Sequence, residues 1–271
     1  MDDVTLYAGD CARVMAEHIT DGSIDLTVTS PPYDNLRAYN GYTFDFEAVS
    51  KQLWRVTKQG GVVVWVVADA TVNGSETGNS FRQALRFMEM GFNLHDTMIY
   101  ETDKPPMNDN RYQACFEYMF ILSKGKVKTF NAIMETASTA GRKREAAITY
   151  RQMDGTLKPQ YRRGLYPDKT IRRSIWYFST GRIPDNERLL INSHTAYFPE
   201  ALARDHIISW SNPGDVVLDP MMGSGTTGKM AVMWQRRFIG IDVSPEYVDM
   251  ARKRIEKARA QSLLFPASSY S

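Results

Sequence analysis

The chain has 271 residues, enough to bury a full hydrophobic core as one large domain or as one domain with an insertion. Its composition, 43% apolar and 24% charged, is ordinary for a globular protein, and the longest apolar run, 62–68, is far too short to span a bilayer. Two cysteines, Cys11 and Cys115, offer neither a disulfide framework nor a metal site, and the acidic amino terminus lacks the layout of a signal peptide. We therefore expect a cytoplasmic protein without membrane segments and without a metal.

The net charge of +2 is unevenly distributed along the chain. Between Lys124 and Arg173 there are 13 lysines and arginines against four acids, so the remainder of the chain is acidic. Such an asymmetry indicates a polyanionic partner. From Lys124 to about Ile171 the hydrophobic periodicity is also lost, and a solvated, flexible loop is the alternative interpretation of this segment.

Strand and helix patterns alternate along the rest of the chain. Hydrophobic runs predict strands at 4–8, 24–28, 62–67, 94–101, 117–123, 175–178, 216–219 and 238–241. Three- and four-residue spacing and capping residues predict helices at 11–18, 44–56, 80–90, 200–209, 229–234 and from 245 onward, with the glycine pair 60–61 ending the second helix. This alternation predicts an α/β fold with a doubly wound, mostly parallel sheet.

The strand at 24–28 runs into the sequence Thr-Ser-Pro-Pro-Tyr at Thr29–Tyr33. Two prolines stop a strand, because each lacks an N–H and restricts the residue before it to extended geometry. The bend presents the Ser30 hydroxyl, the Pro31 carbonyl and the Tyr33 ring at the carboxyl edge of the sheet, where such sheets bind ligands. Two acceptors beside a ring suit a planar heterocycle with an amino group. A Pro-Pro turn with a buried tyrosine is the structural alternative.

A glycine-rich loop, Gly-Ser-Gly-Thr-Thr-Gly at 223–228, lies between a predicted strand and a predicted helix. It satisfies the dinucleotide fingerprint, and Asp242 follows 19 residues after the first glycine, where an acid would bind ribose hydroxyls. An NAD-dependent Rossmann oxidoreductase is therefore one interpretation.

The residues around this loop favour a different ligand. The pair Asp219 and Pro220 places an extra carboxylate before the loop, which suits an ammonium group better than a pyrophosphate. S-adenosylmethionine fits this arrangement, with its ammonium at Asp219, its carboxylate at the N–H groups near Thr226 and Thr227, and its ribose at Asp242.

In their order and spacing, these segments resemble the amino-group DNA methyltransferases of the permuted (β) arrangement. Thr29–Tyr33 matches the catalytic motif of that family, 219–227 its cofactor loop, and 238–247 its ribose motif. The segment 6–10 resembles the opening motif, whose Asp10 approaches the adenine of the cofactor, and 194–200 resembles a segment that packs beside the cofactor.

The resemblance implies a fold and an activity. The fold is a seven-stranded, permuted sheet of the S-adenosylmethionine-dependent methyltransferases, with a catalytic half at 1–124, a target-recognition insertion at 125–180 and a cofactor-binding half at 181–271. The activity is site-specific methyl transfer from S-adenosylmethionine to the exocyclic amine of a flipped-out base in double-stranded DNA. DNA binding would associate the protein with the nucleoid.

Motifs, charge and resemblance together predict three groups of site residues. The catalytic residues are Ser30, Pro31, Pro32 and Tyr33. The cofactor-binding residues are Asp10, Phe198, Glu200, Asp219, Pro220, Gly223, Gly225, Thr226, Thr227 and Asp242. The DNA-binding residues are Arg37, Arg142, Lys143, Arg144, Arg162, Arg163, Arg172 and Arg173.

Serine at position 30 favours cytosine N4 as the target, because adenine-N6 members of the family more often carry Asp or Asn there. Adenine N6 stays open, since both reactions use the same geometry. Methyltransferases acting on RNA, protein or small molecules share the glycine loop, and a non-catalytic nucleic-acid binder leaves the pairing of the two motifs unexplained. The resemblance also allows a homodimer and a cognate restriction endonuclease, although no sequence feature argues for either.

Three further residues receive structural interpretations. Cys11 and Cys115 lack a Pro-Cys context, so neither supports the thiolate route of cytosine-C5 enzymes, and both are interpreted as structural. Asp69, just beyond the strand at 62–67, is interpreted as an exposed loop acid, with a position facing the cofactor as the alternative.

Overall fold

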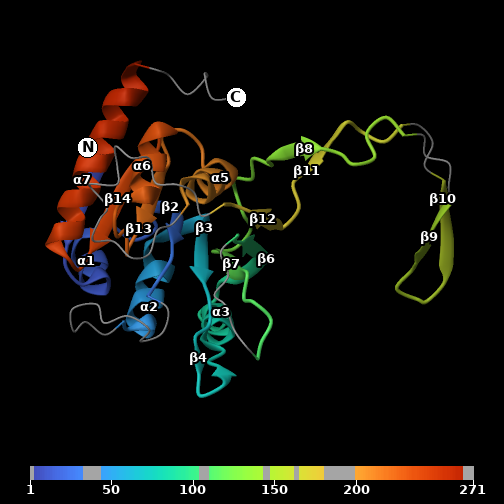
Figure 1. Cartoon of the computed structure of the whole chain (residues 1–271), viewed down its shortest axis with the longest axis horizontal. Helices are drawn as coiled ribbons and strands as arrows, with labels where there is room; N and C mark the ends of the chain where they lie inside the picture. The colour runs from blue at the N-terminus through green and yellow to red at the C-terminus, as the bar shows by residue number, and fades with distance from the viewer. Residues whose placement is uncertain are drawn as a thin grey trace. The chain divides into compact units, whose positions relative to one another are not determined.

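The computed structural model describes residues 3–32, 44–103, 110–142, 147–161, 165–179 and 199–264. The chain divides into two compact units, which are coloured by residue number in Figure 1. Unit 1 comprises Met1–Asn131 and Ser174–Ser271, and unit 2 comprises Ala132–Arg173. Several predicted site residues lie outside the described ranges, namely Tyr33, Arg37, Lys143, Arg144, Arg162, Arg163 and Phe198.

A mixed sheet forms the centre of unit 1. Its strands are β1 (Val4–Ala8), β2 (Ile24–Thr29), β3 (Thr57–Val67), β6 (Asn93–Glu101), β7 (Phe116–Ser123), β12 (Ile175–Tyr177), β13 (Val216–Asp219) and β14 (Arg237–Asp242). Their order across the sheet is β1-β14-β13-β2-β3-β7-β6-β12, and β7 alone among these runs antiparallel to its neighbours. The predicted α/β fold with a mostly parallel sheet is confirmed.

The number of seven strands that the resemblance implied was wrong, because the described sheet has eight, which match the eight strand segments predicted from the hydrophobic runs. The eighth strand is β12, which pairs in parallel with the end of β6 in the register Ile175↔Ile99. The Ile99 N–H donates to the Ser174 carbonyl (2.9 Å), so this short strand extends the sheet beyond the number that the resemblance implied.

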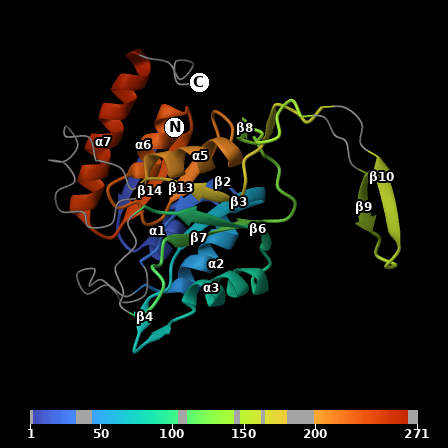
Figure 2. The ribbon, with the colours of Figure 1, turned by 45° about the vertical axis from the view of Figure 1, so that its right-hand side comes forward.

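Helices cover both faces of the sheet. Their bounds are α1 (Cys11–His18), α2 (Phe46–Val56), α3 (Asn79–Glu89), α5 (Glu200–Trp210), α6 (Thr226–Met233) and α7 (Pro245–Leu264). Helices α1, α2 and α3 lie on one face, and α5, α6 and α7 lie on the other (Figure 2). On the first face, a buried cluster joins side chains of all three helices to the sheet, with Leu53 and Phe87 packed near Trp65. No helix in the described ranges is both long and apolar enough to cross a membrane.

The direction of the crossovers reverses between β13 and β2. From β2 the chain passes through α2 to β3 on one side, whereas from β13 it passes through α6 to β14 on the other. The two strands are parallel neighbours in the register Leu218↔Thr27, so their carboxyl ends meet at one edge. A topological switch point of this kind is where open α/β sheets bind their ligands.

The predicted role of the glycine pair 60–61 was wrong, because α2 ends at Val56 and β3 begins immediately after it. Both glycines lie inside the strand. Gly60 has φ +82°, and a Cβ there would lie 2.9 Å from Lys128 Cβ. The Gly60 N–H donates to the Lys124 carbonyl (2.7 Å), so the glycine admits the close approach of a neighbouring segment.

Unit 2 contains two antiparallel strand pairs. The alternative interpretation of the segment from Lys124 to about Ile171 was a flexible loop without regular structure. Strand β8 (Met134–Thr136) pairs with β11 (Lys169–Ile171), and β9 (Ala147–Arg151) pairs with β10 (Leu157–Tyr161). The expectation of a loop without regular structure was wrong, because backbone pairing orders these strands although they lack the one-sided hydrophobic pattern that a covered sheet requires. A further pair, β4 (Thr71–Val72) and β5 (Ser75–Glu76), belongs to unit 1.

Candidate functional site

The proline corner and the glycine loop lie side by side at the switch point. Thr29, the last residue of β2, donates its hydroxyl to Asp219 Oδ1 at 2.8 Å, and Asp219 is the last residue of β13. Thr29 is 1% exposed and Asp219 is 5% exposed. The Thr227 hydroxyl lies 3.4 Å from the Val28 carbonyl, which it approaches as a donor. Residues far apart in the sequence therefore meet at one sheet edge.

The corner itself is only partly accessible. Pro31 is buried, whereas Ser30 and Pro32 are half-buried and begin the turn away from the sheet. The structure therefore keeps the Ser30 and Pro31 positions beside the buried Asp219 end of β13.

Asp242 holds the glycine loop from the neighbouring strand. Its Oδ2 accepts from the Gly223 N–H and its Oδ1 accepts from the Ser244 N–H, both at 2.9 Å. Burial raises the pKa of Asp242, while backbone N–H groups lower it. Each carboxylate oxygen has a second lone pair, so this structural role is compatible with the predicted ribose contact.

The glycines of the loop are required by close packing. Gly225 has φ +80°, and a Cβ there would lie 2.6 Å from Ala251 Cβ on α7. A Cβ at Gly228 would lie 2.4 Å from Phe238 Cε1 on β14. Helix α6 begins at Thr226, and no described side chain caps it. Its first-turn N–H groups are the kind of donors that bind an external anion.

Arg254 supports the loop from beneath, a role that the sequence did not predict. It lies in α7 and is 2% exposed. Its Nη1 donates to the Ser224 carbonyl (2.6 Å) and hydroxyl (3.0 Å) and to Thr226 Oγ1 (3.3 Å). Its Nη2 donates to Glu200 Oε1 (3.1 Å), which also accepts from Lys229 Nζ (2.7 Å). Two buried cations thus share one carboxylate behind the loop, and that arrangement favours an anionic group in front of it.

Helical spacing places Arg254 on the apolar face of α7, three residues after Ala251 and four before Ala258, but no pattern in the sequence indicates its contact with the glycine loop. The helix carries alternating charges that are typical of a solvated face, and only the burial of this one guanidinium reveals its contact with the loop. Glu200, predicted as a cofactor ligand, here binds Lys229 and Arg254, so a direct role in cofactor binding stays a prediction.

Burial raises the pKa of Asp219 to about 6, although hydrogen bonds from the Thr227 and Thr29 hydroxyls oppose the shift. A desolvated carboxylate of this kind gains most from a cationic partner. The donor set therefore fits S-adenosylmethionine, whose ammonium would bind Asp219 and whose carboxylate would bind the start of α6.

The opening motif lies at the same edge. The Gly9 N–H donates to the Asp242 carbonyl (2.9 Å), which brings the end of β1 beside the end of β14. Asp10 is exposed and caps α1, with its Oδ1 accepting from the Arg13 N–H at 2.8 Å. Its predicted approach to an adenine stays a prediction.

One thiol and one acid that the sequence analysis considered have structural explanations. Burial raises the pKa of the Cys11 thiol to about 12, so it is no thiolate nucleophile. The interpretation of Asp69 as an exposed loop acid was wrong, since it is half-buried and binds the start of α3. It accepts from the Ser80 N–H (3.0 Å), the Ser80 hydroxyl and the Thr77 hydroxyl.

The described members of the predicted DNA-binding set all belong to unit 2. Arg142 and Arg173 are exposed and Arg172 is half-buried, with the Arg172 N–H donating to the Ile133 carbonyl (2.9 Å). Their contact with DNA stays a prediction.

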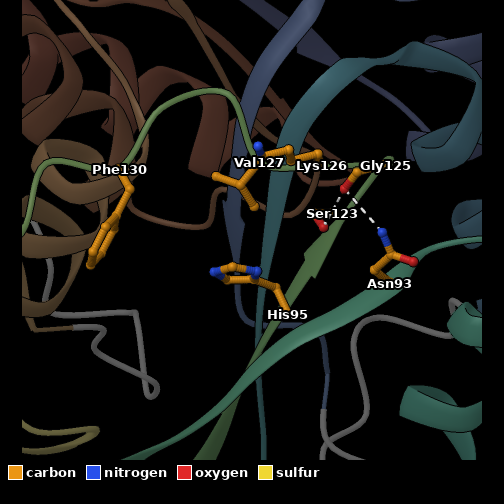
Figure 3. A pocket seen from close by; sticks show the side chains of 7 residues that line it. All are labelled: Asn93, His95, Ser123, Gly125, Lys126, Val127 and Phe130. Atoms are coloured by element: carbon orange, nitrogen blue, oxygen red, sulfur yellow. Dashed lines mark hydrogen bonds between the residues drawn. The ribbon is translucent and has the colours of Figure 1, made fainter.

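A pocket of about 270 Å³ lies away from this site (Figure 3). It lies where β6 begins and β7 ends, which is the opposite edge of the sheet from the ends of β2 and β13. Asn93 Nδ2 and Ser123 Oγ both donate to the Gly125 carbonyl, so these two polar side chains bind the backbone of the pocket's own lining. It is lined by Asn93, His95, Ser123, Gly125, Lys126, Val127 and Phe130.

Comparison with known proteins assigns the family. A model of the N6/N4 methyltransferase family, described as DNA methylase, matches residues 24–253. The orphan methyltransferase M.BamHII of Bacillus amyloliquefaciens is 53% identical over 89% of this chain and 92% of its own length. The chain belongs to the N6/N4 DNA methylase family. The NAD-dependent oxidoreductase interpretation is therefore abandoned.

More distant relatives of this methylase have different targets in their names. The DNA adenine methyltransferase YhdJ of Escherichia coli K12 is 28% identical over 94% of this chain and 83% of its own length. The PvuII DNA methyltransferase, described as cytosine-N4-specific, has the same fold, with a TM-score of 0.68 and 18% identity over 96% of this chain and 93% of its own. The comparisons therefore leave the target base open.

Replacing Asp219 by Asn should change how stability depends on pH. Because the folded-state pKa is raised, the wild type loses free energy of unfolding as pH rises from the unfolded value of 3.8 through about 6. The uncharged amide avoids this loss. The stability advantage of Asp219→Asn over the wild type should grow by roughly 1.4 kcal/mol between pH 5 and pH 8. Urea unfolding at both pH values measures it, and equal differences at the two would contradict the assignment.

Replacing Arg254 by Met should weaken binding of S-adenosylmethionine by roughly 10- to 100-fold, because the loop loses charged hydrogen bonds. Calorimetry of the purified chain measures the affinity. Arg236 is the matched control, since it is also buried and donates to Ser211 Oγ (3.0 Å), at the other end of α6. Arg236→Met should destabilise the fold yet leave the affinity within about twofold. An equal loss of affinity in both variants would mean that Arg254 only supports the fold.

Proposed function

We propose that this methylase transfers a methyl group from S-adenosylmethionine to the exocyclic N4 amine of cytosine in double-stranded DNA. The observation that carries the proposal is the hydrogen bond from Thr29 to Asp219 (2.8 Å). It links the strand end that leads into Ser30 and Pro31 to the strand end that leads into the glycine loop. A site for an amino group and a site for a methyl donor would then adjoin.

S-adenosylmethionine would supply an electrophilic methyl group on a sulfonium. The buried carboxylate of Asp219 would bind its ammonium, the first turn of α6 at Thr226 and Thr227 would bind its carboxylate, and Asp242 would bind its ribose. Asp10 and Phe198 would contact its adenosine, and Pro220 with the glycines at 223 and 225 would shape the loop. Glu200 would contribute through Lys229 and Arg254, which it binds.

An exocyclic amine of a base is a poor nucleophile, because its lone pair is delocalised into the ring. Ser30 Oγ and the Pro31 carbonyl would accept its two N–H hydrogens and draw the nitrogen toward tetrahedral geometry. The lone pair would then attack the methyl carbon directly, the carbon–sulfur bond would break to release S-adenosylhomocysteine, and the nitrogen would lose its extra proton to water. Catalysis of this kind depends mainly on positioning, and no covalent enzyme intermediate is needed.

A base inside a duplex cannot reach a corner at the edge of the sheet, so we infer that the target base flips out and stacks on Tyr33. Unstacking costs a few kcal/mol, and one aromatic contact returns roughly 1–3 kcal/mol. Phosphate contacts would supply the remainder. The candidates are Arg37 and the basic residues of the insertion at 125–180, which we propose is the target-recognition region.

Cytosine N4 is favoured over adenine N6 because the acceptor at position 30 is a neutral serine. Adenine N6 is the second candidate, and the relative named DNA adenine methyltransferase YhdJ is the observation in its favour. A homodimer, a cognate restriction endonuclease and nucleoid association stay predictions.

Mass spectrometry of nucleosides distinguishes methylation of cytosine N4 from methylation of adenine N6. Plasmid DNA is incubated with the chain and S-adenosylmethionine that carries a deuterated methyl group, and is then digested to nucleosides. Labelled N4-methylcytosine is the expected product. Labelled N6-methyladenine would select the second candidate, and DNA without labelled nucleosides would overturn the proposed function.

Replacing Ser30 by Ala should lower the rate of methyl transfer by at least about 100-fold, since one acceptor of the amine hydrogens is lost. The affinity for S-adenosylmethionine should stay within about threefold, because the glycine loop is intact. Single-turnover transfer of radiolabelled methyl and calorimetry measure the two quantities. Full activity in Ser30→Ala would refute its assigned role.

Replacing Arg142, Arg172 and Arg173 together by Ala should weaken DNA binding and make the slope of log affinity against log salt less negative by about 2–3. Fluorescence anisotropy with a labelled duplex at several salt concentrations measures both. The control neutralises three exposed cations on α2 and α7, Lys51, Arg252 and Lys257, and should leave the slope unchanged. If both triple variants behave alike, the predicted set is only part of a solvated surface.

A further inference from the structure

The strands β9 and β10 form an isolated two-stranded ribbon within unit 2. They pair only with each other in the described part of the chain, in an antiparallel register that runs from Leu157↔Arg151 to Tyr161↔Ala147. Every described side chain from 149 to 158 is exposed. Between 149 and 158 neither face of the ribbon is covered by the described part of the chain. An isolated two-stranded hairpin is only marginally stable alone, so a partner that binds these exposed side chains would stabilise it.

A tight turn fixes the tip of the ribbon. The Gly155 N–H donates to the Gln152 carbonyl (2.9 Å), and the Gln152 N–H donates to the Thr156 carbonyl (2.7 Å). Gly155 has φ +83°, so the turn is a three-residue loop that ends in a left-handed glycine. This connection sets the register of the strands and therefore the face on which each side chain lies.

The register gathers hydrogen-bonding side chains on one face. Gln152 and Thr156 face each other at the tip, and Tyr150 is paired with Lys158 one step further along that face. Arg151 lies on the opposite face, directly across from Leu157. The exposed Gln152 amide and the exposed Lys158 ammonium therefore lie on the same face of the ribbon.

The charge of the ribbon suits a polyanion. Its described side chains include the cations Arg151 and Lys158 and one acid, Asp154. Asp154 Oδ1 accepts from the Thr156 N–H (2.9 Å) and hydroxyl (2.7 Å), so the carboxylate is directed into its own turn. The basic excess between Lys124 and Arg173 has the same sign.

The outer edge of β10 is poorly suited to a protein strand. Because Gln152 and Thr156 form the hydrogen-bonded pair at the turn, the alternation of an antiparallel ladder makes Pro159↔Thr149 a pair whose backbone groups face outward. Pro159 lacks the N–H that an added strand would need there. A two-stranded ribbon does fit the major groove of B-DNA, which is about 12 Å wide and 8.5 Å deep.

We propose that the β9–β10 ribbon enters the major groove of the target DNA and supplies its sequence readout. Gln152 and Lys158 contact base edges, and Arg151 contacts the phosphates beside the groove. Glutamine pairs with adenine and lysine with guanine at those edges. This inference rests on the proposed function, because it names the element that recognises the DNA substrate.

The test compares the full-length wild type with the double variant Gln152→Ala and Lys158→Ala. The substrate is a pool of DNA duplexes with a randomised central stretch, and the methylated positions are mapped by sequencing that detects modified bases. A matched control replaces the exposed Lys51 and Lys253 of α2 and α7 by Ala. Calorimetry with S-adenosylmethionine verifies that every variant retains its folded cofactor site.

In the ribbon variant, the ratio of methylation at the preferred site to methylation at its single mismatches should fall at least about tenfold, while the control keeps the wild-type ratio. Affinity for a non-target duplex should change by no more than about threefold. An unchanged site preference, or an equal loss on all sequences, would overturn the inference. If the wild type itself labels no DNA, the proposed function fails instead, so the two failures are distinguishable.

Discussion

The hydrogen bond between the Thr29 hydroxyl and Asp219 Oδ1 is the constraint on which the rest of the site depends. It joins residues 190 positions apart in the sequence at the point where the crossovers of the sheet reverse. The reversal places α2 and α6 on opposite faces of the sheet, so the loops that follow β2 and β13 diverge from one shared edge. One strand end leads into two prolines and the other into a glycine-rich turn.

Burial of the Asp219 carboxylate carries a desolvation cost, and the hydrogen bonds that this carboxylate accepts offset part of that cost. Asp219 is buried beside β2, and its raised pKa reflects the loss of water around the carboxylate. Asp242 and Arg254 hold the glycine loop from two further elements, β14 and α7. The loop is thus fixed before any ligand arrives, which lowers the ordering cost of binding. The same geometry explains why glycine is needed at 225 and 228, where α7 and Phe238 approach within contact distance.

Much of the fold could be predicted from the sequence, because strands and helices in unit 1 have clear periodicity. Strand β1, helix α1 and strand β13 have the predicted bounds, and capping residues such as Asp10 mark where helices begin. The two motifs could also be predicted to share an edge, since both follow buried strands in a parallel sheet. Arg254 could not be found this way, because its burial depends on the packing of α7 over the loop. The strands of unit 2 were missed for a related reason, since the side chains described from 149 to 158 are exposed and no buried face imposes a sustained hydrophobic alternation on them.

We propose that the proline corner and the glycine loop form one ligand site. Amide hydrogen exchange of the full chain, with and without S-adenosylmethionine, tests it most directly. If the two form one site, bound S-adenosylmethionine should slow exchange in the peptides that contain Thr29 and Ser30 as well as in those that contain Gly223–Thr227. Slower exchange in the glycine loop alone, with the corner unchanged, would contradict it.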